Sequence, residues 1–157
     1  MNSFRMLKIA AAALLAMVPA CGDDPVSPAT SFTAALSGTN KVPPVTTTAT
    51  GNAALSVVGS QLTYTVNVTG LSNALVAHIH VAAAGANGPV RLNLCGTGAP
   101  ETGCTSGTGV LAEGSNGTAL GITFDSLLSA MRTGGAYVSV HTSANQGGEI
   151  RGQVAAN

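Results

Sequence analysis

The sequence predicts an all-β protein, an antiparallel β-sandwich or Greek-key barrel of about eight strands with one short helix. Two patterns indicate this fold: apolar residues alternate with polar ones, and turn residues interrupt the alternation at intervals of about ten residues. Composition agrees, because the 157 residues include 20 Gly but only 8% charged and 3% aromatic residues. Many Val, Thr and Gly with few Lys and Glu are typical of short strands joined by tight turns.

The alternation is clearest at residues 62–68, where Leu62, Tyr64, Val66 and Val68 share one face of the predicted strand. Gly59-Ser60, just before it, predicts a hairpin turn. The same pattern predicts further strands over residues 32–36, 53–57, 75–81, 90–94, 110–112, 138–140 and 150–154. The two prolines in 41–45 place that stretch at an edge or in a loop.

One helical segment is expected at residues 123–132. Leu127, Leu128 and Met131 are spaced to lie on one helix face. Thr123 or Asp125 could cap its start, and Gly134-Gly135 would end it.

Residues 1–20 have the pattern of an export signal. Arg5 and Lys8 make a positive start, and an apolar run follows from Ile9 to Val18. A run of roughly ten residues is too short to span a bilayer, which takes about 20, and it fits a cleaved signal. Small residues directly before Cys21 resemble the lipobox of bacterial lipoproteins. That resemblance implies that 1–20 is a lipoprotein signal peptide and that Cys21 carries the lipid; the alternative is a secreted protein whose Cys21 is incidental.

The predicted organisation is a signal at 1–20, a lipidated Cys21 with a flexible tether at 21–31, and one domain at 32–157. The tether is polar, contains prolines and lacks a periodic pattern. Fatty acyl chains such as palmitate would anchor the protein stably to the cell membrane. Asp23 at the third mature position favours the outer membrane where the envelope has one.

Nucleic-acid binding is excluded by charge. The formal net charge is zero, and removing residues 1–20 takes away Arg5 and Lys8. No basic stripe remains to neutralise phosphates, and no aromatic ladder is present to stack bases.

Cys95 and Cys104 flank a short Gly-rich stretch. In an oxidising compartment, and with Cys21 acylated, they are the two remaining thiols and are expected to form a disulfide. The alternative is a metal or redox pair, but their spacing is longer than a C-x-x-C motif.

Three segments resemble the CHRD domain, the chordin-type domain of many exported bacterial proteins. They are FTAALSGTNKVPPVTTTATG near residue 32, LVAHIHVAAAGANGPVRLNLC in the middle, and GGAYVSVHTSANQGGEIRGQ near the end. The resemblance covers residues 32–154 and departs from the family pattern at Gln146, where Pro is frequent. It implies an immunoglobulin-like β-sandwich and leaves the molecular activity open.

Period-two arithmetic gathers polar side chains on one face, opposite the core. The members are His78, His80, His141, Glu149, Arg151 and Arg91. Three interpretations remain open: a structural network in which Glu149 accepts from Arg91, Arg151 or a histidine; a metal site; and a docking surface for a polymer or protein.

In the metal interpretation, the ligands are His78, His80 and His141, with Glu149 or water as the fourth. An H-x-H pair projects two imidazoles side by side, and imidazole suits zinc or copper. The strand is loosely similar to the copper-ligating strand of Cu/Zn superoxide dismutase, although that enzyme's other ligand spacings are missing.

The sequence thus predicts a lipid-anchored CHRD domain that acts as a binding or structural module for an undefined ligand, with an envelope protein or polymer as its partner. The alternative is a zinc- or copper-binding envelope protein, including a redox-active one. No catalytic residues are predicted.

Overall fold

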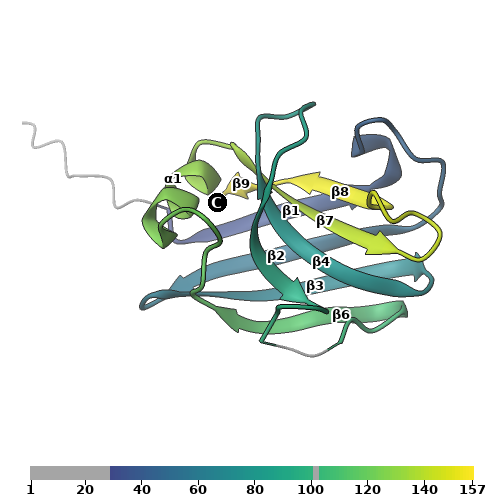
Figure 1. Cartoon of the computed structure of the whole chain (residues 1–157), viewed down its shortest axis with the longest axis horizontal. Coiled ribbons are helices and arrows are strands. Elements are labelled where there is room, and N and C mark those ends of the chain that lie inside the picture. The colour runs from purple at the N-terminus through teal and green to yellow at the C-terminus, as the bar shows by residue number, and fades with distance from the viewer. Residues whose placement is uncertain (1–28, 101–102) are drawn as a thin grey trace, which may run out of the picture.

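The computed structural model describes residues 29–100 and 103–157, which form nine β-strands and one α-helix (Figure 1). The predicted signal at 1–20, Cys21 and most of the tether lie outside the described residues. The observed elements confirm the all-β class with one short helix. In chain order they are β1 (Ser31–Ser37), the 3-10 turn η1 (Gly38–Asn40), β2 (Thr50–Val58), β3 (Gln61–Leu71), β4 (Ala74–Val81), β5 (Val90–Cys95), β6 (Gly107–Asn116), α1 (Phe124–Arg132), β7 (Ala136–Thr142), β8 (Ile150–Gln153) and β9 (Ala155–Ala156).

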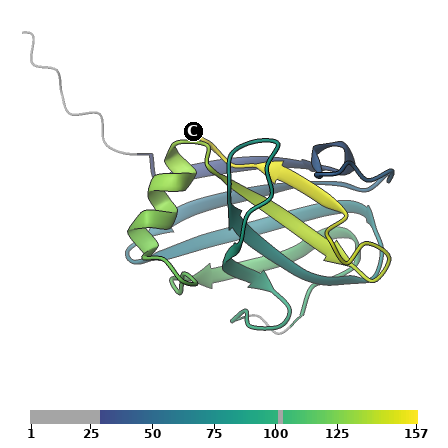
Figure 2. The ribbon, with the colours of Figure 1, turned by 45° about the horizontal axis from the view of Figure 1, so that its top comes forward.

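All strands belong to one antiparallel sheet, in the order β5-β4-β7-β8-β1-β2-β3-β6, with β9 beside β1. The sheet curls until its edge strands β5 and β6 come close, as Figures 1 and 2 show. Across this seam the Asn116 side-chain amide donates to the Asn93 carbonyl at 3.0 Å, and the Leu120 amide donates to the Arg91 carbonyl at 2.8 Å. The result is a nearly closed barrel.

The pairing does not show the two separate sheets of the expected immunoglobulin-like sandwich. A single pair, Ser37 with Arg151, joins β1 to β8 and makes the sheet continuous. Periodicity predicts each strand but not its neighbours, so it could not decide between a sandwich and a barrel; the observed pairing is that of a nearly closed barrel.

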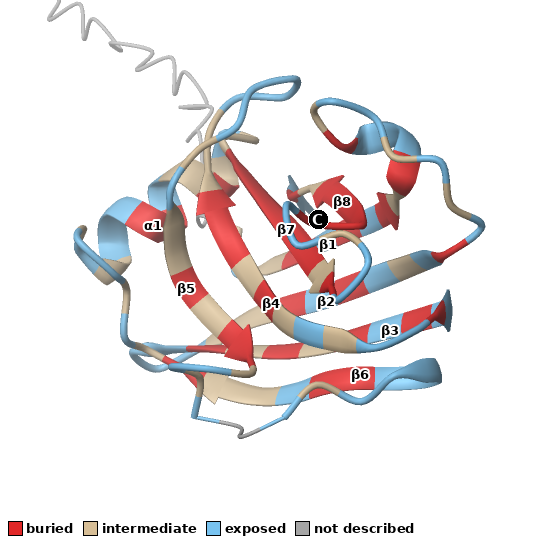
Figure 3. Cartoon of the chain, turned by 45° about the vertical axis from the view of Figure 1, so that its right-hand side comes forward, coloured by how far each residue is buried: buried red, intermediate tan, exposed pale blue. Residues whose placement is uncertain are grey.

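The barrel interior is the hydrophobic core. In β3, Leu62, Tyr64, Val66 and Val68 are all buried, as predicted, and the intervening residues are more exposed. Figure 3 shows that β7 and β8 differ, because they are buried along most of their length. Both faces of these two strands are therefore covered, the inner face by the core and the outer face by loops.

Helix α1 lies at one end of the barrel (Figure 2). The hydroxyl of Thr123 accepts from the Ser126 amide at 3.1 Å, which confirms Thr123 as the N-cap. Leu127, Leu128 and Met131 are buried against the core. Among the described residues there is no helix of the length and apolarity that a bilayer crossing requires.

Cys95 and Cys104 form the predicted disulfide, with their Cα atoms 5.2 Å apart. The bond ties the end of β5 to the segment that leads into β6. It therefore holds together the two strands whose edges close the barrel.

Candidate metal centre

Strands β4 and β7 bring the three histidines together. His78 and His80 alternate with Ala77 and Ile79, which are fully buried in the core. The imidazoles of β4 therefore point to the opposite face of the sheet. His141 of β7 pairs with Val76, so its side chain comes beside that of His78. One ring nitrogen from each histidine lies within 4.8 Å of the others.

Each of these histidines has one buried ring nitrogen without a hydrogen-bond partner among the described residues. These nitrogens are Nδ1 of His78, Nε2 of His80 and Nε2 of His141. Buried polar atoms are nearly always paired, so an unpaired ring nitrogen on each of three clustered histidines makes the cluster a candidate ligand site.

Loops on the outer face fix which nitrogen of two histidines stays free. Nδ1 of His80 lies 2.9 Å from the Gly88 carbonyl, and Nδ1 of His141 lies 2.8 Å from the Gln146 carbonyl. A carbonyl only accepts, so each Nδ1 carries the proton and each Nε2 keeps its lone pair. Such backbone contacts are the usual way that proteins orient metal-binding histidines.

The histidines are held in the neutral form. Burial, followed by the positive charges that His141 and His80 would carry, lowers the pKa of His78 to about 4. Burial also lowers the pKa of His80 and of His141, although the hydrogen bonds to Gly88 and Gln146 partly oppose it. Near neutral pH all three imidazoles therefore have a lone pair available for a ligand bond.

An aromatic and cationic stack supports His80. The Tyr137 ring lies parallel to the His80 ring, with centroids 4.8 Å apart, and the guanidinium carbon of Arg151 lies 3.5 Å from the Tyr137 centroid. The Tyr137 hydroxyl accepts from the Gly88 amide at 3.1 Å. The same residue, Gly88, thus positions both rings.

Glu149 does not join the three histidines in the structure. Its two carboxylate oxygens accept from the hydroxyls of Thr47 and Thr142, each at 2.7 Å. Burial raises the pKa of this carboxyl, but the hydrogen bonds from Thr142, Thr47 and Asn145 lower it below its usual value. The carboxylate is therefore already satisfied without a metal.

Glu149, Arg91 and Arg151, which one of the three open interpretations joins in a network, have separate partners among the described residues. Arg91 donates to the Leu120 carbonyl at 2.9 Å, beside the seam. Arg151 lies under the loops, with neutral oxygens as its partners. The two-residue alternation places these side chains opposite the core, but which of them become neighbours depends on strand order.

Lys41 is a site residue that the sequence analysis missed. Its Nζ donates to the Ser139 hydroxyl at 3.2 Å and to the Gly147 carbonyl at 2.9 Å. Its side chain is only 7% exposed. One sequence feature could have drawn attention to Lys41. It is the lone Lys of a charge-poor domain, and it lies next to the prolines of a stretch expected at an edge or in a loop.

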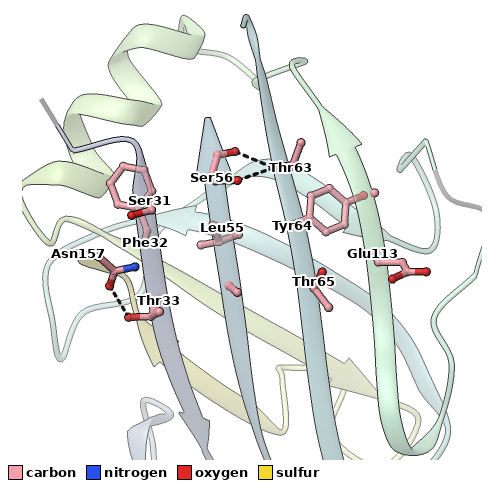
Figure 4. Close-up of a pocket in the computed structure, with 12 residues that line it drawn as sticks. Ser31, Phe32, Thr33, Leu55, Ser56, Thr63, Tyr64, Thr65, Glu113 and Asn157 are labelled. Carbon is pink, nitrogen blue, oxygen red and sulfur yellow. Dashed lines mark hydrogen bonds between the residues drawn. The ribbon is translucent and has the colours of Figure 1, made fainter. Parts of the chain in front are cut away.

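A shallow groove of about 630 Å³ crosses β1, β2, β3 and β6 (Figure 4). Short hydroxyl side chains line much of it, and those of Ser56 and Thr63 bond each other at 2.7 Å. Glu113 is its one charged residue, and no histidine reaches it.

A comparison with protein families matches the CHRD domain model to residues 32–154, a range that runs from the second residue of β1 to just past the end of β8. The chain belongs to the CHRD-domain family. The match confirms the resemblance found in the sequence, and it places all three histidines inside this CHRD domain. No curated protein and no solved structure matches the chain.

Proposed function

We propose that this CHRD domain binds a transition-metal ion, copper or zinc, through His78, His80 and His141. The observation that carries the proposal is that three histidines, each with a buried unpaired ring nitrogen, offer ligand atoms within 4.8 Å of one another. Their neutral state and the backbone contacts at two Nδ1 atoms support it. The sequence predicts a binding module whose ligand is undefined, and in this proposal that ligand is the metal ion.

The spacing of the nitrogens suits a metal ion. Zinc–imidazole bonds of about 2.0–2.1 Å set three ligand nitrogens roughly 3.3–3.6 Å apart. The observed separations, all within 4.8 Å, need to shorten by at most about 1.5 Å, which small side-chain rotations supply. Three imidazoles also suit copper, and the fourth position is left for water or an added small molecule.

We also propose that the domain is exported and held on the cell membrane by lipid on Cys21. The sequence of residues 1–21 supports this, and the Cys95–Cys104 disulfide fits an oxidising compartment. Labelled palmitate should enter the native protein and not a Cys21→Ser variant. If the wild-type protein takes up no labelled palmitate, the proposal of a lipid anchor is wrong.

Metal binding is tested on purified protein stripped with a chelator. Calorimetric titration with Zn²⁺ and with Cu²⁺ should give one ion per chain. His78→Ala, His80→Ala and His141→Ala should each weaken binding by about 100-fold or more, because each removes a direct ligand. The copper-loaded protein should show nitrogen couplings in its electron paramagnetic resonance spectrum.

The matched control is Tyr64→Phe, which removes a buried hydrogen bond outside the three-histidine set. It should bind metal like the wild type despite a lower stability. If neither ion binds, or if the histidine variants lose stability but no affinity, the histidines are structural. The search for a ligand would then turn to envelope polymers and proteins.

A further inference from the structure

Two buried cations line one cavity beside the histidines. The cavity has a volume of about 320 Å³, and its wall includes Lys41, Arg151, Asn40 and Gln153. Lys41 is 7% exposed and Arg151 is 1% exposed, so the fold covers most of both side chains. A cavity of this size is at the lower end of the range that holds small molecules.

In the described part of the chain, both charges have only neutral partners. Lys41 donates to a hydroxyl and to a backbone carbonyl. Arg151 donates to Asn87, Ala83 and Gln153 through long bonds of 3.3–3.5 Å, all to neutral oxygens. Within residues 29–100 and 103–157, neither cation forms an ion pair, and the nearby Glu149 carboxylate is bonded to hydroxyls.

This arrangement is costly without a counter-ion. Removing a charge from water is unfavourable unless an opposite charge accompanies it. Here burial, followed by the positive charge of Arg151, lowers the pKa of Lys41, so the two like charges disfavour each other. Donor capacity is also left over, because an ammonium has three N–H groups and a guanidinium has five.

We propose that the cavity between Lys41 and Arg151 is a binding site for a small oxyanion, either a carboxylate or an inorganic oxyanion. The Lys41 ammonium supplies a point charge and the Arg151 guanidinium a planar set of donors. Stacking on Tyr137 holds the guanidinium in place. The anion supplies the negative charge that neither cation finds among the described residues.

The anion site adjoins the three-histidine site but does not depend on it. No histidine lines the cavity, and Tyr137 stands between Arg151 and His80. The positive charges of Lys41 and Arg151 both act on His80. A bound anion would offset these charges, and its binding can be measured on metal-free protein whatever the histidines bind.

The test is calorimetric titration of chelator-treated protein with acetate, phosphate and sulfate, at constant ionic strength maintained with sodium chloride. Saturable binding of one anion per chain is expected for at least one of the three, with a rise in the thermal unfolding midpoint. Acetate binding alone would identify a carboxylate ligand, and binding of phosphate or sulfate would identify an inorganic oxyanion.

Variants decide whether the cavity is responsible. Lys41→Gln should lower the affinity for the anion at least tenfold, and Lys41→Arg should retain most of that affinity. Arg91→Gln is the matched control, because it removes a cation that lies outside the cavity. The proposal is overturned if no anion binds saturably, or if Lys41→Gln and Arg91→Gln lower the response equally, which would show general charge screening.

Discussion

The stability of the metal-free protein should fall as the pH is lowered from 7.5 to 5, because the histidines are buried in neutral form. The pKa of His78 is about 4 in the folded protein and 6.5 in an unfolded chain. Between these values the unfolded chain binds more protons, so acid favours unfolding. The contribution is fully present above pH 6.5 and is lost as the pH falls toward 4.

The magnitude follows from the two pKa values. For one histidine with these values, linkage gives a loss of about 2 kcal/mol between pH 7.5 and pH 5. His78 is only partly buried, and solvent screening reduces this to about 1 kcal/mol. His80 and His141 shift in the same direction and add to the loss.

The assay is urea unfolding in the presence of a chelator at several pH values, with wild type beside His78→Gln. The variant should lose about 1 kcal/mol less than wild type over this range. Glu149 does not confuse the comparison, because its lowered pKa confines its effect to pH values below about 4.5. Equal slopes for the two proteins, or greater stability at pH 5, would refute the reasoning.

Three further predictions concern the scaffold. Tyr64→Phe should cost about 1–2 kcal/mol in urea unfolding, because the buried Leu94 carbonyl loses its 2.7 Å donor; an unchanged midpoint would contradict this. Thr123→Ala should cost about 1 kcal/mol by removing the helix N-cap, whereas Thr123→Ser should be nearly neutral. Reducing the Cys95–Cys104 bond should lower the free energy of unfolding by about 2–3 kcal/mol, since it releases a closed loop of about ten residues, and equal stability with and without reductant would disprove it.

Local patterns predicted most of the secondary structure. Alternation identified the strands and the buried face of β3, and the Thr123 cap set the start of α1. Strand β6 was predicted too short, at 110–112 instead of Gly107–Asn116, because its glycines hide the alternation. A register shift opposite β3 also puts Leu111 and Ala112, adjacent residues, both in buried positions.

The candidate site was predictable in its residue types but not in its assembly. Period two puts His78 and His80 on one face, and nothing local brings His141 to them. That contact depends on β4 pairing with β7 across about 60 residues of chain, which is a long-range choice. The contacts of Lys41 were unpredictable for the same reason, since its partners Ser139 and Gly147 lie in β7 and the loop after it, although its isolation in a charge-poor domain was visible in the sequence.

The seam between β5 and β6 has a consequence for how copies of this protein meet. An unpaired edge strand is a template on which a second chain can add its own strand. Here the carbonyls of Arg91 and Asn93 already accept from Leu120 and Asn116, although no strand ladder forms there. Copies of this domain that meet at high local concentration would therefore find no free edge along this part of β5, and strand-to-strand aggregation through it is disfavoured.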